Sequence, residues 1–182
     1  MKNLVLLSLL VNLNIGFSQY CTYSGGVCGN NLWAATNYAE NVVEEICEVL
    51  DIDYIDIYQG SLQNACATVL DGEPIIIYNP DFLNFLYQRN TWAPVSVIAH
   101  EVGHHLSKHS SWYGQFEHSW TRELKADYIS GYALYKLGCR NLNDARSTFY
   151  IMFNWIGSSS HPDSPRRIAA LTQGYLRAKN GY

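Results

Sequence analysis

Four histidines and one glutamate lie within eleven residues, in the segment AHEVGHHLSKH at 99–109. Each residue of an α-helix advances by about 100° and about 1.5 Å, so side chains four positions apart lie on one face. His100 and His104 can therefore direct their imidazole rings at a single metal ion. His105 points about 140° away from His100, and His109 lies a further turn along. We predict that His100 and His104 are two ligands of one metal ion.

Glu101 follows His100 directly, so its carboxyl group lies beside such a metal ion rather than on it. This position suits a general base that takes a proton from a water molecule on the metal. A zinc ion lowers the pKa of that water from about 15.7 towards about 7, so a nearby carboxylate can accept the proton. The His-Glu-x-x-His spacing, with the apolar residues Val97, Ile98 and Val102 around it, predicts a catalytic zinc centre on a helix.

The third ligand decides the class of zinc site. One zinc-peptidase pattern requires glycine three residues and histidine six residues after the second histidine. Ser107 and Ser110 stand there, which excludes that pattern. The segment TRELKADYISGYAL instead offers Glu123 and Asp127, one helical turn apart on one face. Glu123 can complete a site that leaves a fourth position for water, as catalytic zinc sites do. The alternative is a solvated helix face whose acids pair with neighbouring basic residues.

Asp127 has a different expected role from Glu123. A carboxylate behind a ligating histidine accepts a hydrogen bond from the free ring nitrogen, which fixes the tautomer and raises the basicity of the ligand. One turn beyond Glu123, Asp127 is placed to do this for His100 or His104. We therefore expect Asp127 to support a ligand rather than to bind the metal.

An α+β domain is predicted around these residues, because a few short strands are followed by helices. Apolar residues at helical spacing predict helices within 31–50 and at about 93–108, 119–137 and 143–156, with a last helix beginning near Pro165. Alternating β-branched and aromatic residues predict a strand within 53–60. The Asp71-Gly72 turn signal predicts two further strands within 64–80.

The composition and charge of the chain indicate its class of protein and limit the kinds of partner that it can bind. The chain has 182 residues, of which 48% are apolar and 15% are charged, which is typical of one globular domain, here 19–182. A formal net charge of −4 argues against nucleic acid as a partner. No stretch after the first residues reaches the roughly 20 apolar residues that a transmembrane helix needs.

The first residues, 1–18, are typical of a secretory signal peptide. Lys2 precedes a short apolar run at 4–13, and Gly16 and Ser18 lie at the small-residue positions of a cleavage site before Gln19. The alternative is a retained amphipathic anchor. We expect the mature chain to be exported, either to a periplasm or out of the cell.

Five cysteines fit an oxidising compartment, namely Cys21, Cys28, Cys47, Cys66 and Cys139. Two disulfides can form, with one thiol left over. Cys21 and Cys28 flank a Gly-Gly turn, so our first expectation is a local bridge between them. No pair has the Cys-x-x-Cys spacing of a zinc knuckle, so we interpret the cysteines as structural.

Three motifs together resemble a known family. His100-Glu101-Val102-Gly103-His104, Glu123-Leu124-Lys125-Ala126-Asp127 and SHPDSPRRIAAL occur in the order found in gluzincin metallopeptidases of the HtpX, CAAX prenyl protease and BepA type. NACATVLDGEPIIIYNPDFL also resembles the edge strand and following strand of that family. The resemblance covers roughly residues 60–175.

The resemblance implies a zincin-like α+β fold and a zinc-dependent endopeptidase. It implies that zinc is bound by His100, His104 and Glu123, that Glu101 is the base, and that Asp127 orients a ligand. His161 would stabilise the oxyanion of the tetrahedral intermediate, and Arg167 would help to order its loop, although a His-Pro turn is also a common helix cap. An edge strand would bind an extended peptide or protein substrate by strand addition. This strand would contain Asn64, Ala65, Cys66 and Ala67.

Two other functions fit the sequence. The first is a non-catalytic exported protein of zinc-binding or chaperone-like type, with a metal ion that serves stability. The second is a zymogen, in which Cys21, Cys28 or the Gly/Asn-rich lead before Asn31 blocks the site until it is removed. Many members of the resembling family lie in membranes or carry a helical repeat domain, so their substrates do not transfer to this chain.

Overall fold

The structure is a computed structural model that describes residues 21–22, 28, 31–107, 118–152, 154 and 156–181. Its strands are β1 (Cys21–Thr22), β2 (Leu32–Ala34), β3 (Asp56–Gly60), β4 (Ala65–Leu70) and β5 (Glu73–Tyr78). Its helices are α1 (Asn37–Leu50), α2 (Pro80–Tyr87), α3 (Trp92–Leu106), α4 (Ser119–Lys136), α5 (Leu142–Ala145), α6 (Ser147–Ile151) and α7 (Ser164–Asn180). The predicted α+β class is confirmed. The predicted signal peptide, 1–18, lies outside the described residues.

The strands form one sheet in the order β1-β4-β5-β3-β2. β4 and β5 are the antiparallel hairpin predicted around Asp71-Gly72, where both residues have positive φ. β3 pairs in parallel with β5, and β2 pairs antiparallel with β3. The expectation that β4 is an edge strand is wrong, because the two residues of β1 pair with its outer side. No pattern within residues 64–80 could reveal a partner that lies more than forty positions earlier in the chain.

The two faces of the sheet contact different layers, because successive side chains of a strand point to opposite sides. One face packs on the helices and forms the main core, in which Ala65 and Ile76 join the apolar residues of α1 and α3. The other face carries a smaller cluster of Cys28, Cys66, Ile75 and Ile77.

The Cys21–Cys28 bridge expected from the sequence is wrong. Cys28 is instead bonded to Cys66 of β4, with their Cα atoms 6.1 Å apart. Folding brings Cys28 over the outer face of the sheet, so its nearest partner in space is distant in sequence. Cys47 and Cys139 are free, buried thiols. The disulfide is compatible with an exported protein.

Two helices differ from the prediction, one for a local reason and one for a tertiary reason. α2 was not predicted, although Asn79 caps it by accepting hydrogen bonds from the N–H groups of the first turn and Pro80 begins it. The single helix expected at 143–156 is instead the two short helices α5 and α6. The chain turns between them at Arg146, whose side chain donates a hydrogen bond to Thr172 of α7. That contact is tertiary, so local periodicity did not indicate the break.

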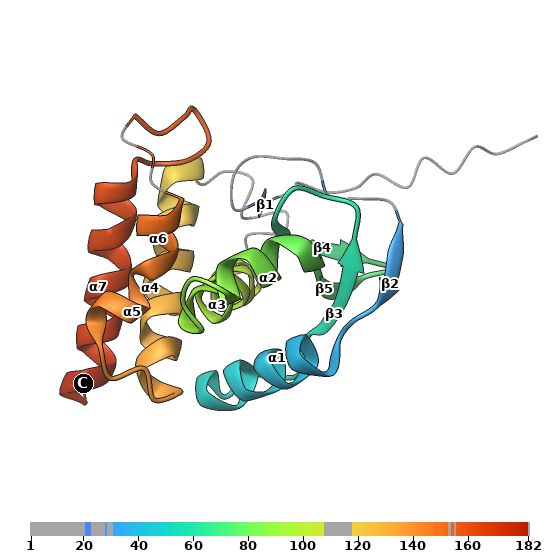
Figure 1. The fold of residues 1–182 in the computed structure, drawn as a ribbon, viewed down its shortest axis with the longest axis horizontal. Helices are drawn as coiled ribbons and strands as arrows, with labels where there is room; N and C mark the ends of the chain where they lie inside the picture. The colour runs from blue at the N-terminus through green and yellow to red at the C-terminus, as the bar shows by residue number, and fades with distance from the viewer. Residues whose placement is uncertain are drawn as a thin grey trace, which may run out of the picture.

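α4, α5, α6 and α7 stand at one side of the molecule and the sheet at the other, with α2 and α3 between them and α1 below (Figure 1). α4 and α7 pack closely because Gly131 and Gly174 leave no side chain at their contacts. α3 approaches α4 at Gly103, where an added Cβ would lie 3.0 Å from the backbone of Ala126. Among the described residues, no helix has both the length and the apolarity needed to cross a bilayer.

Candidate metal centre

The helix that carries the His-Glu-x-x-His motif lies in the centre of the core. Asn90 accepts a hydrogen bond from the Trp92 N–H at its start, and every residue from Ala93 to His104 is buried. A helix that is apolar on all sides belongs in the interior, so its few polar side chains must find partners there. His100, Glu101 and His104 are therefore buried and shielded from bulk solvent.

Glu123 of α4 meets the two histidines, as predicted. The Nε2 atoms of His100 and His104 lie 3.1 Å apart. Each Nε2 lies 3.4 Å from an oxygen of Glu123. Tetrahedral zinc with bonds of about 2.0–2.2 Å places its ligand atoms about 3.3–3.6 Å from one another. The three side chains, all buried, are thus spaced to hold one metal ion.

Two oxygens of this cluster indicate that it fits a cation. Glu123 Oε2 and Glu101 Oε1 are buried, and neither accepts a hydrogen bond among the described residues, while Glu123 Oε2 lies 3.5 Å from Nη2 of Arg167 in an ion pair. Buried polar atoms nearly always have a hydrogen-bond partner, because losing hydration without compensation is costly. A bound cation would compensate Glu123, and a water molecule beside it would compensate Glu101.

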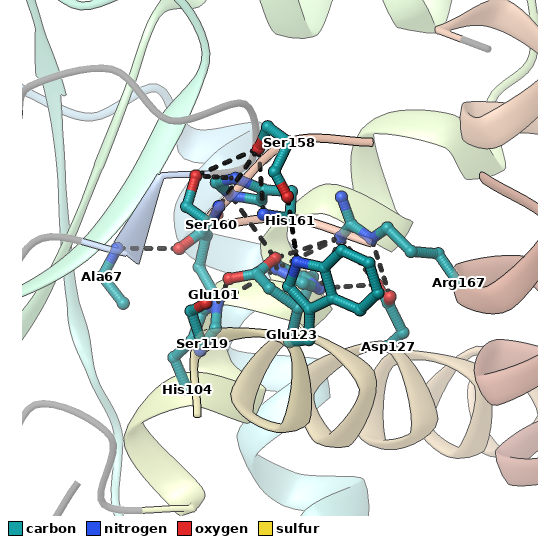
Figure 2. Close-up of polar contacts among 12 residues, drawn as sticks. Ala67, Glu101, His104, Ser119, Glu123, Asp127, Ser158, Ser160, His161 and Arg167 are labelled. Atoms are coloured by element: carbon teal, nitrogen blue, oxygen red, sulfur yellow. Dashed lines mark hydrogen bonds and ion pairs between the residues drawn. The ribbon is translucent and has the colours of Figure 1, made fainter. Parts of the chain in front are cut away.

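Asp127 lies behind His100, as expected. Its Oδ1 is 2.8 Å from Nδ1 of His100, the ring nitrogen that faces away from Glu123. Arg167 of α7 then donates two hydrogen bonds of 2.8 Å to the two oxygens of Asp127. Figure 2 shows Arg167 and Asp127 on one side of Glu123. These hydrogen bonds, from Arg167 to Asp127 and between Asp127 and His100, fix the orientation of the His100 ring.

Burial and charge set the protonation of the cluster. Burial opposes ionisation of Glu123, but His104 and His100 outweigh it and hold the pKa of Glu123 well below its ordinary value. Burial likewise opposes ionisation of Asp127, but Arg167 and His100 outweigh it and lower the pKa of Asp127. Burial lowers the pKa of His104 to about 4. Burial also opposes the charged form of His100, but Asp127 outweighs it and raises the pKa to about 9. The ionised Glu123 and the neutral His104 can bind a cation directly, and binding would release a proton from His100.

Glu101 is attached to the sheet rather than to the metal ligands. Its Oε2 accepts a hydrogen bond of 2.8 Å from the Ala67 N–H of β4 (Figure 2). Burial raises the pKa of Glu101 to about 8, although the nearby His100 opposes this shift. Glu101 therefore lies between the metal ligands and β4, with one oxygen oriented by backbone.

His161 also reaches the cluster. Its Nε2 lies 3.6 Å from Glu123 Oε2, and its Nδ1 is 2.8 Å from the hydroxyl of Ser160. A cavity of about 140 Å³ lies beside it, lined in part by His161 and Arg167. Arg167 was expected to order the His161 loop, and its strongest contacts are with Asp127. His161 and Arg167 thus both lie next to residues of the metal cluster.

The four residues predicted to bind substrate have different surroundings. Ala67 touches Glu101, so β4 borders the metal cluster. Cys66 faces the opposite side of the sheet, where it forms the disulfide. Ala65 packs in the main core, and the Asn64 carbonyl accepts a hydrogen bond from the Asn79 N–H. Of these four residues, Ala67 is the one in contact with Glu101.

Sequence reasoning missed the role of Gly103. A glycine in the middle of a helix is unfavourable unless packing requires it, so its position inside the motif was a usable signal. Here it allows α4 to approach α3 closely enough for Glu123 to reach both histidines.

Comparison with known proteins identifies no relative, since no protein-family model, curated protein or solved structure matches the chain significantly. The function proposed below therefore depends on the geometry of His100, His104, Glu123 and Glu101, with support from the order of the motifs.

Proposed function

We propose that this protein is a zinc-dependent metalloendopeptidase. The observation that carries the proposal is the convergence of His100, His104 and Glu123 at 3.1–3.4 Å, with the unshared Oε1 of Glu101 beside them. Two histidines and a carboxylate are the donor set of many catalytic zinc sites. The motif order that resembles gluzincin peptidases supports the same activity.

Each residue has a definite task in peptide hydrolysis. Zinc held there supplies Lewis acidity, which polarises a carbonyl group and acidifies water. Glu101 takes a proton from the attacking water and returns it to the leaving amine. Burial raises the pKa of Glu101 to about 8 in the metal-free protein, and a zinc ion beside it would favour the ionised carboxylate that can accept a proton. Asp127 and Arg167 keep the His100 ring in place, and His161 is close enough to stabilise negative charge on the substrate oxygen.

The number of ligands distinguishes catalysis from a structural role. Structural zinc sites are usually closed by four protein ligands, whereas catalytic ones keep one position for water. Among the described residues, the group spaced for a metal ion has three members. Glu101 is not a member of it and lies in the position of a base. Together these features favour an enzyme.

A non-catalytic zinc-binding or chaperone-like protein is the alternative. The observation that favours it is His161, whose Nε2 lies 3.6 Å from Glu123 Oε2. A small movement of its loop would add a fourth protein ligand and close the site. A closed site would contribute to folding stability rather than to hydrolysis.

The variant Glu101→Gln separates the two functions. We expect it to bind zinc like the wild type and to lose at least about 100-fold in the rate of peptide hydrolysis, the usual contribution of a positioned acid–base group. Glu44→Gln, a change of the same kind on the exposed side of α1, is the matched control and should cleave normally. Zinc content is measured by atomic absorption, and cleavage of a peptide mixture by mass spectrometry with a chelator control.

Two results would count against the proposal. Full activity of Glu101→Gln would remove the role assigned to Glu101. Stoichiometric zinc in the wild type without cleavage of any peptide in a broad mixture would support the binding protein instead.

A further inference from the structure

The outer side of β4 is partly covered by another part of the same chain. β1 pairs antiparallel with β4, with Cys21 opposite Ala67 and Thr22 opposite Cys66. This is the side on which an extended peptide would add to β4 as a new strand. β1 therefore lies where the backbone of a substrate is expected.

Ala67, the residue of β4 that pairs with Cys21 of β1, is also the residue that contacts Glu101, the proposed base. Ala67 donates its N–H to Glu101 Oε2, so this N–H points away from β5 and towards the outer side of the strand. Backbone groups alternate between the two sides of a strand, so the groups of Ala67, and not those of Cys66, face β1. Cys21 is the residue opposite them. β1 thus meets β4 at the residue that joins the strand to Glu101.

A disulfide keeps β1 close to this place. Cys28 follows Thr22 by six positions and is bonded to Cys66, the direct neighbour of Ala67. Cys66 is fully buried, and Cys28 nearly so. A short tether of this kind gives the attached segment an effective concentration in the millimolar range, without any further contact. β1 therefore competes for the edge of β4 even though its own pairing is short.

We propose that β1, tethered through the Cys28–Cys66 disulfide, is a built-in competitive inhibitor that occupies the substrate edge of β4. The inference rests on the proposed peptidase function and concerns the regulation of that site. A competitor of this kind raises KM and leaves kcat unchanged, because the catalytic groups are intact once β1 has moved away. Because the Ala67 N–H is donated to Glu101, the Ala67 carbonyl is the group left to accept a hydrogen bond from the Cys21 N–H. One backbone hydrogen bond, at its net strength in water, corresponds to about a 2- to 13-fold preference for the covered state.

The test compares two substitutions at one position in the full-length chain. Cys21→Pro and Cys21→Ala both remove the thiol, but only proline removes the backbone N–H and disfavours pairing. Kinetics use an internally quenched version of a peptide that the wild type cleaves. Binding uses a fluorescein-labelled decapeptide rich in valine and threonine, titrated into the same variants carrying Glu101→Gln. Thermal melts and thiol counting confirm that each variant is folded with its disulfide intact.

We expect Cys21→Pro to lower KM and the decapeptide Kd by about 2- to 13-fold relative to Cys21→Ala, with equal kcat. Cys28→Ser, which removes the tether, should change KM and Kd in the same direction, and it replaces Cys21→Pro if that variant does not fold. Equal KM and equal Kd in folded Cys21→Pro and Cys21→Ala would overturn the inference while leaving the peptidase proposal intact. If no variant cleaves any peptide although zinc is bound, the peptidase proposal fails, and the Kd comparison still decides whether β1 covers the edge.

Discussion

Gly103 offers the sharpest test of how the metal ligands are brought together. It lies inside the His-Glu-x-x-His motif, and a Cβ built on it would lie 3.0 Å from the Cα and carbonyl oxygen of Ala126 and 3.3 Å from the Cβ of Ile129. Because backbone cannot rotate away as a flexible side chain can, α4 must shift by a few tenths of an ångström in Gly103→Ala. Glu123 is one turn before Ala126 on the same helix, so its carboxylate moves away from the histidines.

For Gly103→Ala, two opposing effects set the change in the free energy of unfolding, and the shift of Glu123 sets the change in zinc affinity. Overpacking a core costs about 1–3 kcal/mol, whereas alanine in place of glycine inside a helix gains about 1 kcal/mol. The net loss in the free energy of unfolding is therefore about 0–2 kcal/mol, and the protein stays folded. Zinc sites tolerate departures of only about 0.2 Å in ligand distance, so we expect zinc affinity to fall about 10-fold or more.

Zinc affinity is measured by competition with a chromophoric chelator, and stability by urea unfolding of the metal-free protein. Ile98→Val is the matched control, because Ile98 is buried on the same helix and its truncation costs about 0.5–1.5 kcal/mol without adding an atom between α3 and α4. This control should bind zinc like the wild type. If folded Gly103→Ala also binds zinc as tightly as the wild type, the spacing of α3 and α4 does not control the site and the reasoning is wrong.

Three further predictions concern metal, pH and packing. Zinc at about 1,000 times its Kd should stabilise the protein by about 4 kcal/mol, so a chelator should lower the Tm of the wild type by roughly 8–16 °C and that of Glu123→Gln much less, as measured by calorimetry. In the metal-free protein, burial opposes ionisation of Asp127, but Arg167 outweighs it and lowers the pKa of Asp127 below 3.8. Its stabilisation is therefore present above about pH 4 and lost as pH falls through the folded pKa, so urea unfolding at pH 2.5–6 should show a steeper acid loss in the wild type than in Asp127→Asn. Gly174→Ala would place a Cβ 1.8 Å from the carbonyl oxygen of Tyr128, so a loss of more than about 3 kcal/mol is expected, and urea unfolding that matches the wild type would contradict the close packing of α4 and α7.

Much of the candidate site could be predicted because it depends on local periodicity. His100 and His104 share a face in any α-helix, and Glu123 and Asp127 do the same on theirs. The chemistry of each side chain then indicates its role, and the structure places all four within one buried cluster. The helix start at Asn79 and Pro80 was equally local, and it was missed although its capping signal is present in the sequence.

The remaining features could not be predicted because they join positions that are far apart in the chain. The break between α5 and α6 accompanies a contact between Arg146 and Thr172, and Cys28 is bonded to Cys66, which lies 38 positions later in the chain. The residues on either side of these positions show no pattern that would predict either contact. The residues of a strand likewise do not indicate what pairs with its outer side, so the sequence predicts β4 as an edge strand, whereas β1 pairs with it.

The sequence alone determined which residues can bind a metal ion and which acid can serve as the base, because residue type and helical spacing suffice for that. Only the tertiary structure decided that α4 comes close enough to α3 at Gly103 and that Arg167 holds Asp127. It also decided that β1 pairs with β4 at Ala67. The physical reason is that ligand spacing on one helix is a property of the helix, whereas the distance between elements depends on the packing of the whole core.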